Sequence, residues 1–231
     1  MAAFRFKQFS VEQDDVAMKV GTDGVLIGAW VNCADAVRVL DIGTGTGLIA
    51  LMVAQRSDAQ SIVGIDIDSA AAVCAARNFA ASPWSERLSA HQKAAQEYDG
   101  EKFDLILSNP PYFVDSLLCP DDRRTTARHT TELTFEQLDS AVCRLLSESG
   151  RFALILPTEQ MEKYMALTAL KVVRRCDVIS VVGGVVKRVM AEFAFDFEGA
   201  PATETITIEK GRRGDYCEQY IELTKEFYLK F

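Results

Sequence analysis

Short apolar segments rich in β-branched residues alternate with longer alanine-rich segments through most of the chain. The short segments have the length of buried strands, and the longer ones carry apolar residues at helical spacing. This alternation predicts βαβ units around a doubly wound, mostly parallel sheet, which is an α/β fold. Strands of this core are predicted over 37–40, 61–66, 87–92, 103–108 and 152–156, and helices over 48–56, 69–80 and 134–147.

The two ends of the chain depart from this alternation. Residues 4–9 alternate apolar and polar side chains like a half-exposed strand, and residues 22–30 are helical in character. After the last core strand, three strand-like runs have no long helix between them, so we expect them to form an antiparallel edge of the sheet. These runs are 177–182, 190–197 and 205–209, and a final amphipathic helix is expected over 216–228.

The chain length suits one α/β domain. It has 231 residues, of which 48% are hydrophobic, and we find no repeat or proline-rich linker that would mark a second domain. We therefore expect a single domain over 1–231, made of a short N-terminal extension, 1–36, and a core, 37–231. No apolar run reaches the ~18 residues that span a membrane, and the first residues lack the apolar centre of a signal peptide. These features predict a cytoplasmic protein.

Composition narrows the chemistry. The six cysteines include no CxxC pair and the chain has two histidines, so we expect reduced thiols and no metal site. The formal net charge of −8 has the wrong sign for a protein that coats nucleic acid non-specifically. An RNA substrate would therefore require a local basic patch. We expect the protein to be a monomer.

A glycine loop, Asp41-Ile42-Gly43-Thr44-Gly45-Thr46-Gly47, follows the first core strand directly. Its three glycines allow a sharp turn and let a ligand approach where a Cβ atom would collide. Asp66 ends the second core strand, so its carboxylate can accept both hydroxyls of a ribose, and Ile67 is placed to pack on an adenine. The pattern predicts a site for an adenosine-bearing cofactor.

The glycines and the acid alone fit both S-adenosylmethionine and a nicotinamide dinucleotide. Asp41 discriminates between them, because a carboxylate at the start of the loop would repel a pyrophosphate and attract a sulfonium or an α-amino group. The charge therefore favours S-adenosylmethionine. The alternative is that the glycines form only a tight turn between a strand and a helix.

A second motif, Asn109-Pro110-Pro111-Tyr112, lies at the end of the strand 103–108. The lone pair of an exocyclic aromatic amine is delocalised, and hydrogen bonds from its NH₂ to the Asn109 side-chain oxygen and the Pro110 carbonyl would localise it and stabilise developing positive charge. The prolines restrict the preceding residues, and Tyr112 offers a ring for stacking. This motif predicts methyl transfer to a planar amine. The alternative is a turn that only ends the strand.

With these two motifs the chain resembles bacterial class I methyltransferases that depend on S-adenosylmethionine, and most of all the valine-tRNA adenosine N6-methyltransferases. The resemblance extends to the segments 6–9, 17–24, 82–84 and 227–229. It implies a seven-stranded Rossmann-like methyltransferase sheet, S-adenosylmethionine as cofactor, and tRNA as partner. The implied reaction is methylation of the N6 amine of adenosine 37, next to the anticodon of valine tRNA.

The resemblance also implies roles for individual residues. Asn109, Pro110 and Tyr112 would be catalytic. The implied cofactor-binding residues are Lys19, Thr22, Asp41, Gly43, Gly45, Gly47, Asp66, Ile67 and Asn109. One departure concerns the end of the third core strand, where these enzymes often carry an Asp that contacts the adenine amine. This chain has Gln92-Lys93-Ala94-Ala95 there, which leaves open how the donor adenine is recognised.

Basic residues in two regions are candidates for phosphate contacts. They are Arg5, Lys7, Arg123, Arg124 and Arg128. Further, weaker candidates are Lys187, Arg188, Lys210, Arg212 and Arg213. The alternative for the arginines of the aperiodic segment 113–131 is a solvated loop balanced by acidic neighbours.

Other functions remain open at this stage. The tetrapeptide can hold any planar NH₂ group, so a protein glutamine amide or another nucleic-acid adenine is an alternative substrate. The glutamine-modifying class usually has a helical domain ahead of its core, whereas 36 residues precede the core strand here. A nicotinamide oxidoreductase and a donor-binding protein without catalysis are alternatives of other classes.

Overall fold

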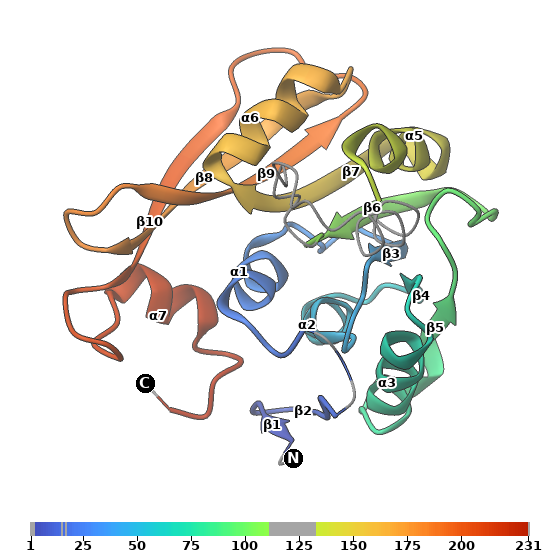
Figure 1. Ribbon diagram of the computed structural model, residues 1–231, viewed down its shortest axis with the longest axis horizontal. Coiled ribbons are helices and arrows are strands. Elements are labelled where there is room, and N and C mark those ends of the chain that lie inside the picture. The colour runs from blue at the N-terminus through green and yellow to red at the C-terminus, as the bar shows by residue number, and fades with distance from the viewer. Residues whose placement is uncertain (1–2, 15, 17, 111–132, 231) are drawn as a thin grey trace, which may run out of the picture.

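The computed structural model describes residues 3–14, 16, 18–110 and 133–230. Within these residues the centre of the molecule is an eight-stranded sheet with helices on both faces (Figure 1). The strand order is β10-β8-β9-β7-β6-β3-β4-β5. The strands are β3 (Arg38–Ile42), β4 (Ser61–Asp66), β5 (Leu88–Gln92), β6 (Phe103–Ser108), β7 (Leu146–Pro157), β8 (Lys171–Val181), β9 (Val186–Ala194) and β10 (Ala202–Glu209).

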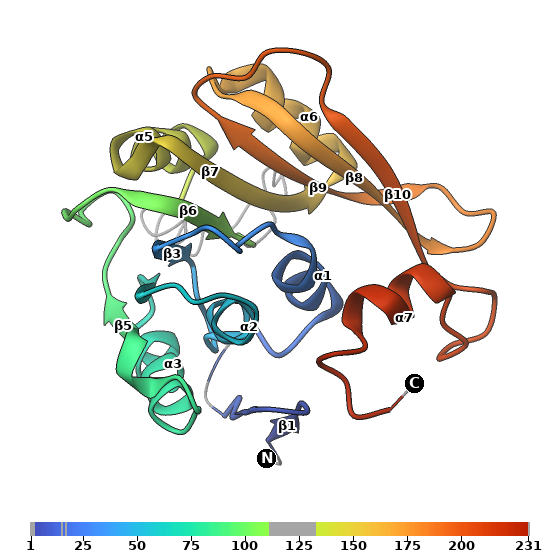
Figure 2. The same ribbon diagram turned by 180° about the vertical axis from the view of Figure 1, so that it is seen from behind.

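Neighbouring residues of the central strands face different cores, as expected for a sheet that is buried on both sides. In β3, Val39 belongs to one core and Leu40 to the other. Helices α1 (Thr22–Trp30), α2 (Leu48–Arg56) and α3 (Ser69–Ala80) pack into the first core, and α5 (Phe135–Leu145) and α6 (Thr158–Leu167) into the second. Figure 2 shows the two groups from behind.

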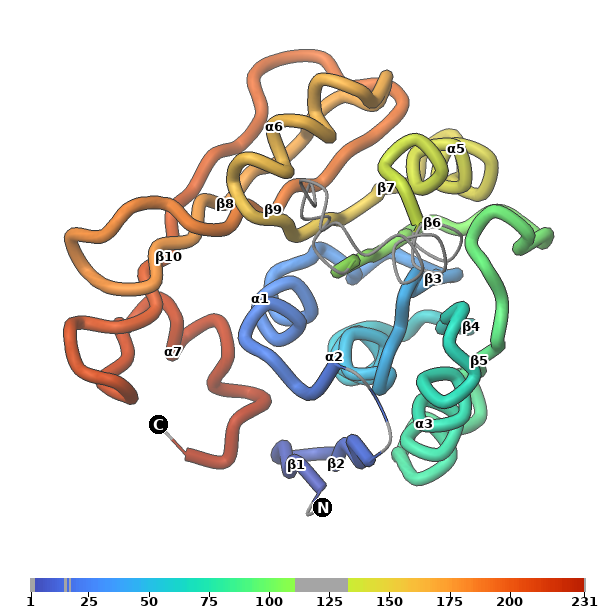
Figure 3. Tube along the Cα trace, in the orientation of Figure 1, coloured from blue at the N-terminus to red at the C-terminus, as the bar shows by residue number. Residues whose placement is uncertain are grey.

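The two ends of the chain lie at the same end of the molecule (Figure 3). A small antiparallel hairpin, β1 (Phe4–Arg5) and β2 (Ser10–Val11), packs beside the segment that follows α7 (Glu218–Thr224). The Lys7 amide donates to the Phe227 carbonyl at 2.8 Å, which joins the two ends. None of the helices in the described part of the chain combines the length and apolar character needed to cross a membrane.

The strand order places a ligand site at one edge of the sheet. β3 pairs in parallel with β4 on one side and β6 on the other, so the order in which successive strands join the sheet reverses at β3. In open α/β sheets a crevice forms at such a point, outside the carboxyl ends of the strands. The glycine loop follows β3, Asp66 ends β4 and Asn109 follows β6. All three therefore reach the same crevice.

The α/β fold class is confirmed, and several predicted elements have the bounds that the pattern indicated. These are the helices 22–30, 48–56 and 69–80 and the strands 61–66 and 103–108. Thr134 caps α5 as part of a capping box, since its hydroxyl accepts from the Gln137 amide at 3.2 Å and the Gln137 side chain accepts from the Thr134 amide at 2.9 Å.

The edge of the sheet differs from the prediction. β9 is antiparallel to β7 and β8 as expected, but β10 pairs with β8 in parallel, and the sheet formed by the described residues has eight strands rather than seven. The cause is topological: β10 reverses direction after β9, but β8 lies between them, so β10 runs parallel to its actual neighbour.

Other differences concern local boundaries. Helix α6, over Thr158–Leu167, was not predicted, and β7 begins at Leu146, where the pattern had extended the preceding helix to 147. The expected strand over 4–9 contributes only Phe4–Arg5, and the final helix covers Glu218–Thr224 rather than 216–228. Tertiary packing shortens or extends these elements beyond what their periodicity indicates.

Candidate active site

The glycine loop has the backbone conformation that its sequence predicts. Gly43, Gly45 and Gly47 have φ values of +72°, +55° and +81°, a region that side chains with a Cβ rarely adopt. A Cβ at Gly47 would collide with the ring of Phe79. At Gly43 and Gly45 no heavy atom lies within 4 Å of where a Cβ would be. Gly47 therefore serves packing, whereas the other two face open space that a ligand can occupy.

Asp66 holds this loop in place from the end of β4. Its Oδ2 accepts a hydrogen bond from the Gly45 amide at 2.9 Å, and its Oδ1 accepts one from the Asp68 amide at 3.0 Å. Burial raises the pKa of the Asp66 carboxyl, against the opposing effect of these amides. Each carboxylate oxygen can accept more than one hydrogen bond, so the group retains acceptor capacity towards the crevice.

Asp41 lies beneath the loop, with 0% of its surface exposed. Its Oδ2 accepts from the Thr44 hydroxyl at 2.8 Å, whereas its Oδ1 has no hydrogen-bond partner in the described residues. Burial raises the pKa of Asp41 to about 7, although the Thr44 hydroxyl opposes the shift. Asp41 does not line the cavity, so its carboxylate is not placed to contact a ligand there directly, which weakens the charge argument drawn from the sequence.

A cavity of about 270 Å³ opens outside the carboxyl ends of β3, β4 and β6. Asn109 and Pro110 form one wall, and the Ser108 hydroxyl ties this end of β6 to β3 by donating to the Ile42 carbonyl at 2.9 Å. The amino end of α1 lies against Asn109, because a Cβ at Gly24 would be 3.9 Å from its Nδ2. Asn109 thus lies between the cavity and α1.

The opposite wall comes from the segment after β5. Lys93, Ala94, Ala95 and Gln96 line the cavity, and the Lys93 amide donates to the Asp66 carbonyl at 2.9 Å. This is the segment where the resemblance led us to expect an Asp that this chain lacks. None of these four residues carries a carboxylate that could accept a hydrogen bond from an adenine amine.

An asparagine that sequence reasoning missed connects the loop to the N-terminal segment. Asn78 in α3 is 2% exposed, and its Nδ2 donates to the Thr46 carbonyl at 2.8 Å and to the Glu12 carbonyl at 2.9 Å. Its Oδ1 accepts from the Glu12 amide at 2.8 Å. A few residues further along the chain, Val16 and Met18 line the cavity. Asn78 therefore fixes both the loop and the start of the segment that covers the site.

The comparison with known proteins agrees with this geometry. A family profile described as the methyltransferase small domain matches residues 24–163. A tRNA1(Val) (adenine(37)-N6)-methyltransferase from Bacteroides thetaiotaomicron is 48% identical over 232 residues, which cover 98% of this chain and 97% of that protein. A protein of the same name from Actinobacillus succinogenes is 45% identical, with 99% and 98% covered. This chain belongs to that methyltransferase family.

Solved structures show the same fold at low sequence identity. A crystal structure described as a predicted O-methyltransferase from Agrobacterium tumefaciens has a TM-score of 0.67 and 14% identity, covering 89% of this chain and 96% of that one. The tRNA m1G37 methyltransferase of M. jannaschii has a TM-score of 0.59 and 16% identity, covering 85% and 55%. The Rossmann-like methyltransferase fold implied by the resemblance is therefore confirmed.

Six of the eleven catalytic and cofactor-binding residues that the sequence singled out line the cavity. Those that line it are Gly43, Gly45, Asp66, Ile67, Asn109 and Pro110. Lys19, Thr22, Asp41 and Gly47 are not among its lining residues. Tyr112, Arg123, Arg124 and Arg128 lie outside the described residues. The cavity is also lined by three residues that were not predicted, Val16, Met18 and Leu133. No local sequence pattern marks such residues, because it is the fold that brings them to the cavity.

The two N-terminal basic candidates lie elsewhere. Arg5 and Lys7 belong to or follow β1, which Figures 1 and 2 place well away from β6. The Lys7 ammonium donates to the Lys225 carbonyl at 2.6 Å. This contact gives Lys7 a structural role at the junction of the chain ends, and a role in RNA binding remains a prediction.

Replacing Asn78 by Ala should weaken both folding and donor binding. The change leaves the Thr46 carbonyl and both backbone groups of Glu12 without their buried partner, which should cost ~2–4 kcal/mol of unfolding free energy. Urea unfolding and calorimetric titration with S-adenosylmethionine measure the two effects. Asn32→Ala, at an exposed asparagine, is the matched control. Stability within ~0.5 kcal/mol of the wild type would contradict the assigned role.

The buried Asp41 should make stability depend on pH. An unfolded Asp carboxyl titrates near pH ~4, whereas the folded pKa is about 7. Between these pH values the folded state retains a proton that the unfolded state has lost. The contribution of Asp41 to the free energy of unfolding therefore falls as pH rises from 4 to 7. Above pH 7 this contribution no longer changes. Relative to Asp41→Asn, the wild type should lose up to about 1.4 kcal/mol per pH unit in this window. If the unfolding free energies of the wild type and of Asp41→Asn change in parallel from pH 5 to 8, the assignment of a raised pKa to Asp41 is wrong.

Proposed function

We propose that this protein transfers the methyl group of S-adenosylmethionine to the N6 amine of adenosine 37 in valine tRNA. The observation that carries the proposal is the position of Asn109, which follows β6 and lines the same cavity as Gly43 and Asp66. Relatives that match nearly the whole chain are named for this reaction. The tetrapeptide alone would also fit a glutamine amide or another adenine, and the relatives favour the tRNA.

The residues of the cavity fit this donor. Open space beside Gly43 and Gly45 lets a ligand contact the loop backbone, and Asp66 offers carboxylate oxygens for ribose hydroxyls. Ile67 and the alanines after β5 offer an apolar slot for an adenine. When bound, S-adenosylmethionine supplies an electrophilic methyl group on a sulfonium. The chain's own residues must then orient and activate the acceptor amine.

Two acceptors at the end of β6 activate the amine. The Asn109 side-chain oxygen and the Pro110 carbonyl accept its two N–H groups, which draws the nitrogen towards tetrahedral geometry and localises its lone pair. The same oxygens stabilise the positive charge that develops on nitrogen. Ser108, held to β3, and the proline that follows Asn109 keep both acceptors rigid. The excess proton of the methylated amine passes to water, so no general base is needed.

We also propose that residues 1–231 act as one domain, as a monomer in the cytosol. The hydrogen bond between the Lys7 amide and the Phe227 carbonyl supports a single unit, because it joins the N-terminal extension to the end of the chain. A mass near 25.5 kDa by light scattering would support the monomer.

Asn109→Ala should lower turnover by ~100-fold or more while leaving donor affinity nearly unchanged, because the lost acceptor acts mainly in the transition state. The assay supplies tritiated S-adenosylmethionine and tRNA from a strain that lacks the modification, followed by digestion to nucleosides. Asn32→Ala should retain wild-type turnover. Equal methyl incorporation by wild type and Asn109→Ala would favour a donor-binding protein without catalysis.

Asp66→Ala should weaken donor binding first, whereas Asn109→Ala should lower turnover and leave donor affinity nearly unchanged. The change removes the ribose acceptor and the anchor of the Gly45 amide, so the dissociation constant for S-adenosylmethionine should rise by about 10-fold or more. Calorimetric titration measures this constant directly. Unchanged donor affinity in this variant would show that the ribose contact is misplaced, and binding of NAD by the wild type in place of S-adenosylmethionine would contradict the proposed function.

A further inference from the structure

A basic surface adjoins the active site at the carboxyl end of the sheet. Pro157, the last residue of β7, pairs with Arg188 near the start of β9, and Val181 at the end of β8 pairs with Glu209 at the end of β10. Residues 182–188 and 209–215 therefore lie at the edge of the sheet from which Asn109 emerges. We call these two segments the edge surface. Figures 1 and 2 show the β8–β9 turn beside the loop that connects β10 to α7.

Backbone hydrogen bonds hold the edge surface together. The Val182 amide donates to the Glu209 carbonyl at 3.0 Å, and the Lys210 amide donates to the Asp215 carbonyl at 2.8 Å. The Glu209 carboxylate accepts from the Gly214 amide at 2.8 Å. The β8–β9 turn is built around Gly183, which has a φ of +79°. The side chains of both segments thus project from a constrained backbone.

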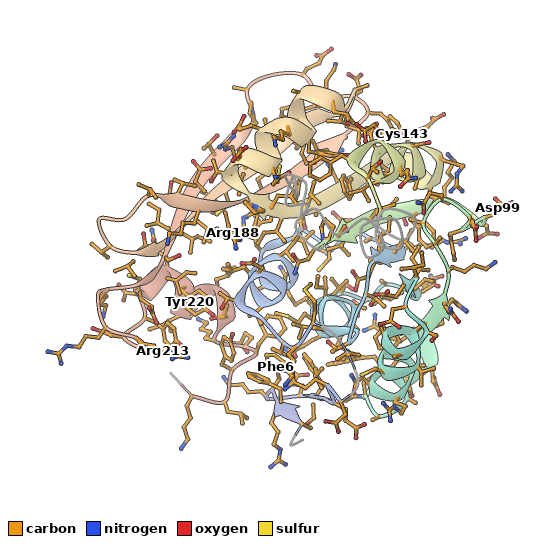
Figure 4. The ribbon with its side chains drawn as sticks, viewed as in Figure 1. Phe6, Asp99, Cys143, Arg188, Arg213 and Tyr220 are labelled. Carbon is orange, nitrogen blue, oxygen red and sulfur yellow. The ribbon has the colours of Figure 1, made fainter. Side chains whose placement is uncertain are left out.

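Charge on the edge surface is opposite in sign to that of the whole protein. The net charge of the chain is −8, whereas these segments contain five cationic side chains and two carboxylates. Lys187, Arg212 and Arg213 are exposed and form no ion pair with a described residue, and Arg213 extends outward from its loop in Figure 4. Lys210 forms an exposed pair with Asp215 at 3.6 Å, which is worth little in water. Lys187, Arg212 and Arg213 are therefore available to an anionic partner.

A short chain of contacts links the edge surface to the catalytic asparagine. The Arg188 Nε donates to the Asp23 carboxylate at 3.0 Å, which fixes the first turn of α1 against β9. The next residue, Gly24, lies against the Asn109 side chain. Arg188, the neighbour of Lys187 in sequence, is thus connected through Asp23 and Gly24 to the Asn109 side chain that lines the cavity.

Two exposed aliphatic side chains accompany the cations. Val182 and Val185 are 60% and 72% exposed in the β8–β9 turn. Proteins that recognise RNA loops contact phosphates with basic groups and unstacked bases or sugars with apolar groups. An anticodon loop presents both kinds of group around its exposed bases. The combination of cations and valines favours RNA over a small anion.

We propose that the edge surface binds the sugar–phosphate backbone of the RNA substrate next to the target adenosine, with Lys187, Arg212 and Arg213 on phosphates. This assignment rests on the proposed function. It names an RNA-binding surface in the described part of the chain, distinct from the N-terminal candidates Arg5 and Lys7.

The test is the salt dependence of tRNA binding, measured by fluorescence anisotropy on unmodified tRNA. The variant Lys187→Ala/Arg212→Ala/Arg213→Ala should bind about 10–100-fold more weakly near 0.1 M salt, and its plot of log affinity against log salt should be shallower by about 2–3. Its affinity for S-adenosylmethionine should equal that of the wild type. The charge-conserving variant Lys187→Arg/Arg212→Lys/Arg213→Lys should bind within about 3-fold of the wild type.

Lys171→Ala is the matched control, because Lys171 is an exposed lysine at the other end of β8. If the alanine triple variant binds tRNA like this control, with the same salt slope, the edge surface is misassigned even though the wild type methylates tRNA. Weak binding by the charge-conserving variant as well would also overturn the assignment, because charge would then not be the cause. A wild type that binds tRNA only through these residues but methylates none would instead refute the proposed function.

Discussion

Parallel pairing of β3 with β4 on one side and β6 on the other is the constraint on which the site depends. Each of these strands is buried on both faces, and a shift of one residue in register would exchange the side chains between the two cores. That register brings Asp66, the glycine loop and Asn109 to one edge. The Ser108–Ile42 and Asp66–Gly45 hydrogen bonds then fix the ends of the strands to one another.

The same edge carries an electrostatic cost. Asp41 and Asp66 are both buried enough to have raised pKa values, and Asp66 contributes to the shift of Asp41. Two carboxyls in one region are destabilised when both are ionised unless a positive charge lies near them. Backbone amides and the Thr44 hydroxyl offset only part of this cost. A cationic ligand in the adjoining cavity would offset more, so the arrangement favours a sulfonium over a pyrophosphate even though Asp41 lies beneath the loop.

Sequence patterns predicted the elements whose conformation depends mainly on residues that are neighbours in the chain. The helix over 69–80 has its own apolar face, and the glycine loop and Asn109 carry conformational or chemical requirements that few other residues meet. Asn78 could not be recognised in this way, since its role depends on Thr46 and Glu12, which are distant in sequence. The parallel pairing of β10 was missed for the same reason. It depends on which strand lies between β9 and β10, and no local pattern encodes that choice.

The departures from prediction at the end of the chain bear on how an acidic protein could select an RNA. Strand β10 lengthens the sheet beyond β8 and brings a second loop to the edge from which Asn109 emerges. A net charge of −8 repels nucleic acid over most of the surface, whereas exposed cations in one place attract it locally. Association would then be productive mainly in orientations that bring the RNA backbone to this edge. If the edge surface binds RNA as proposed, the extension of the sheet and the acidity of the remainder act in the same direction, because both would confine RNA to the side of the molecule from which Asn109 emerges.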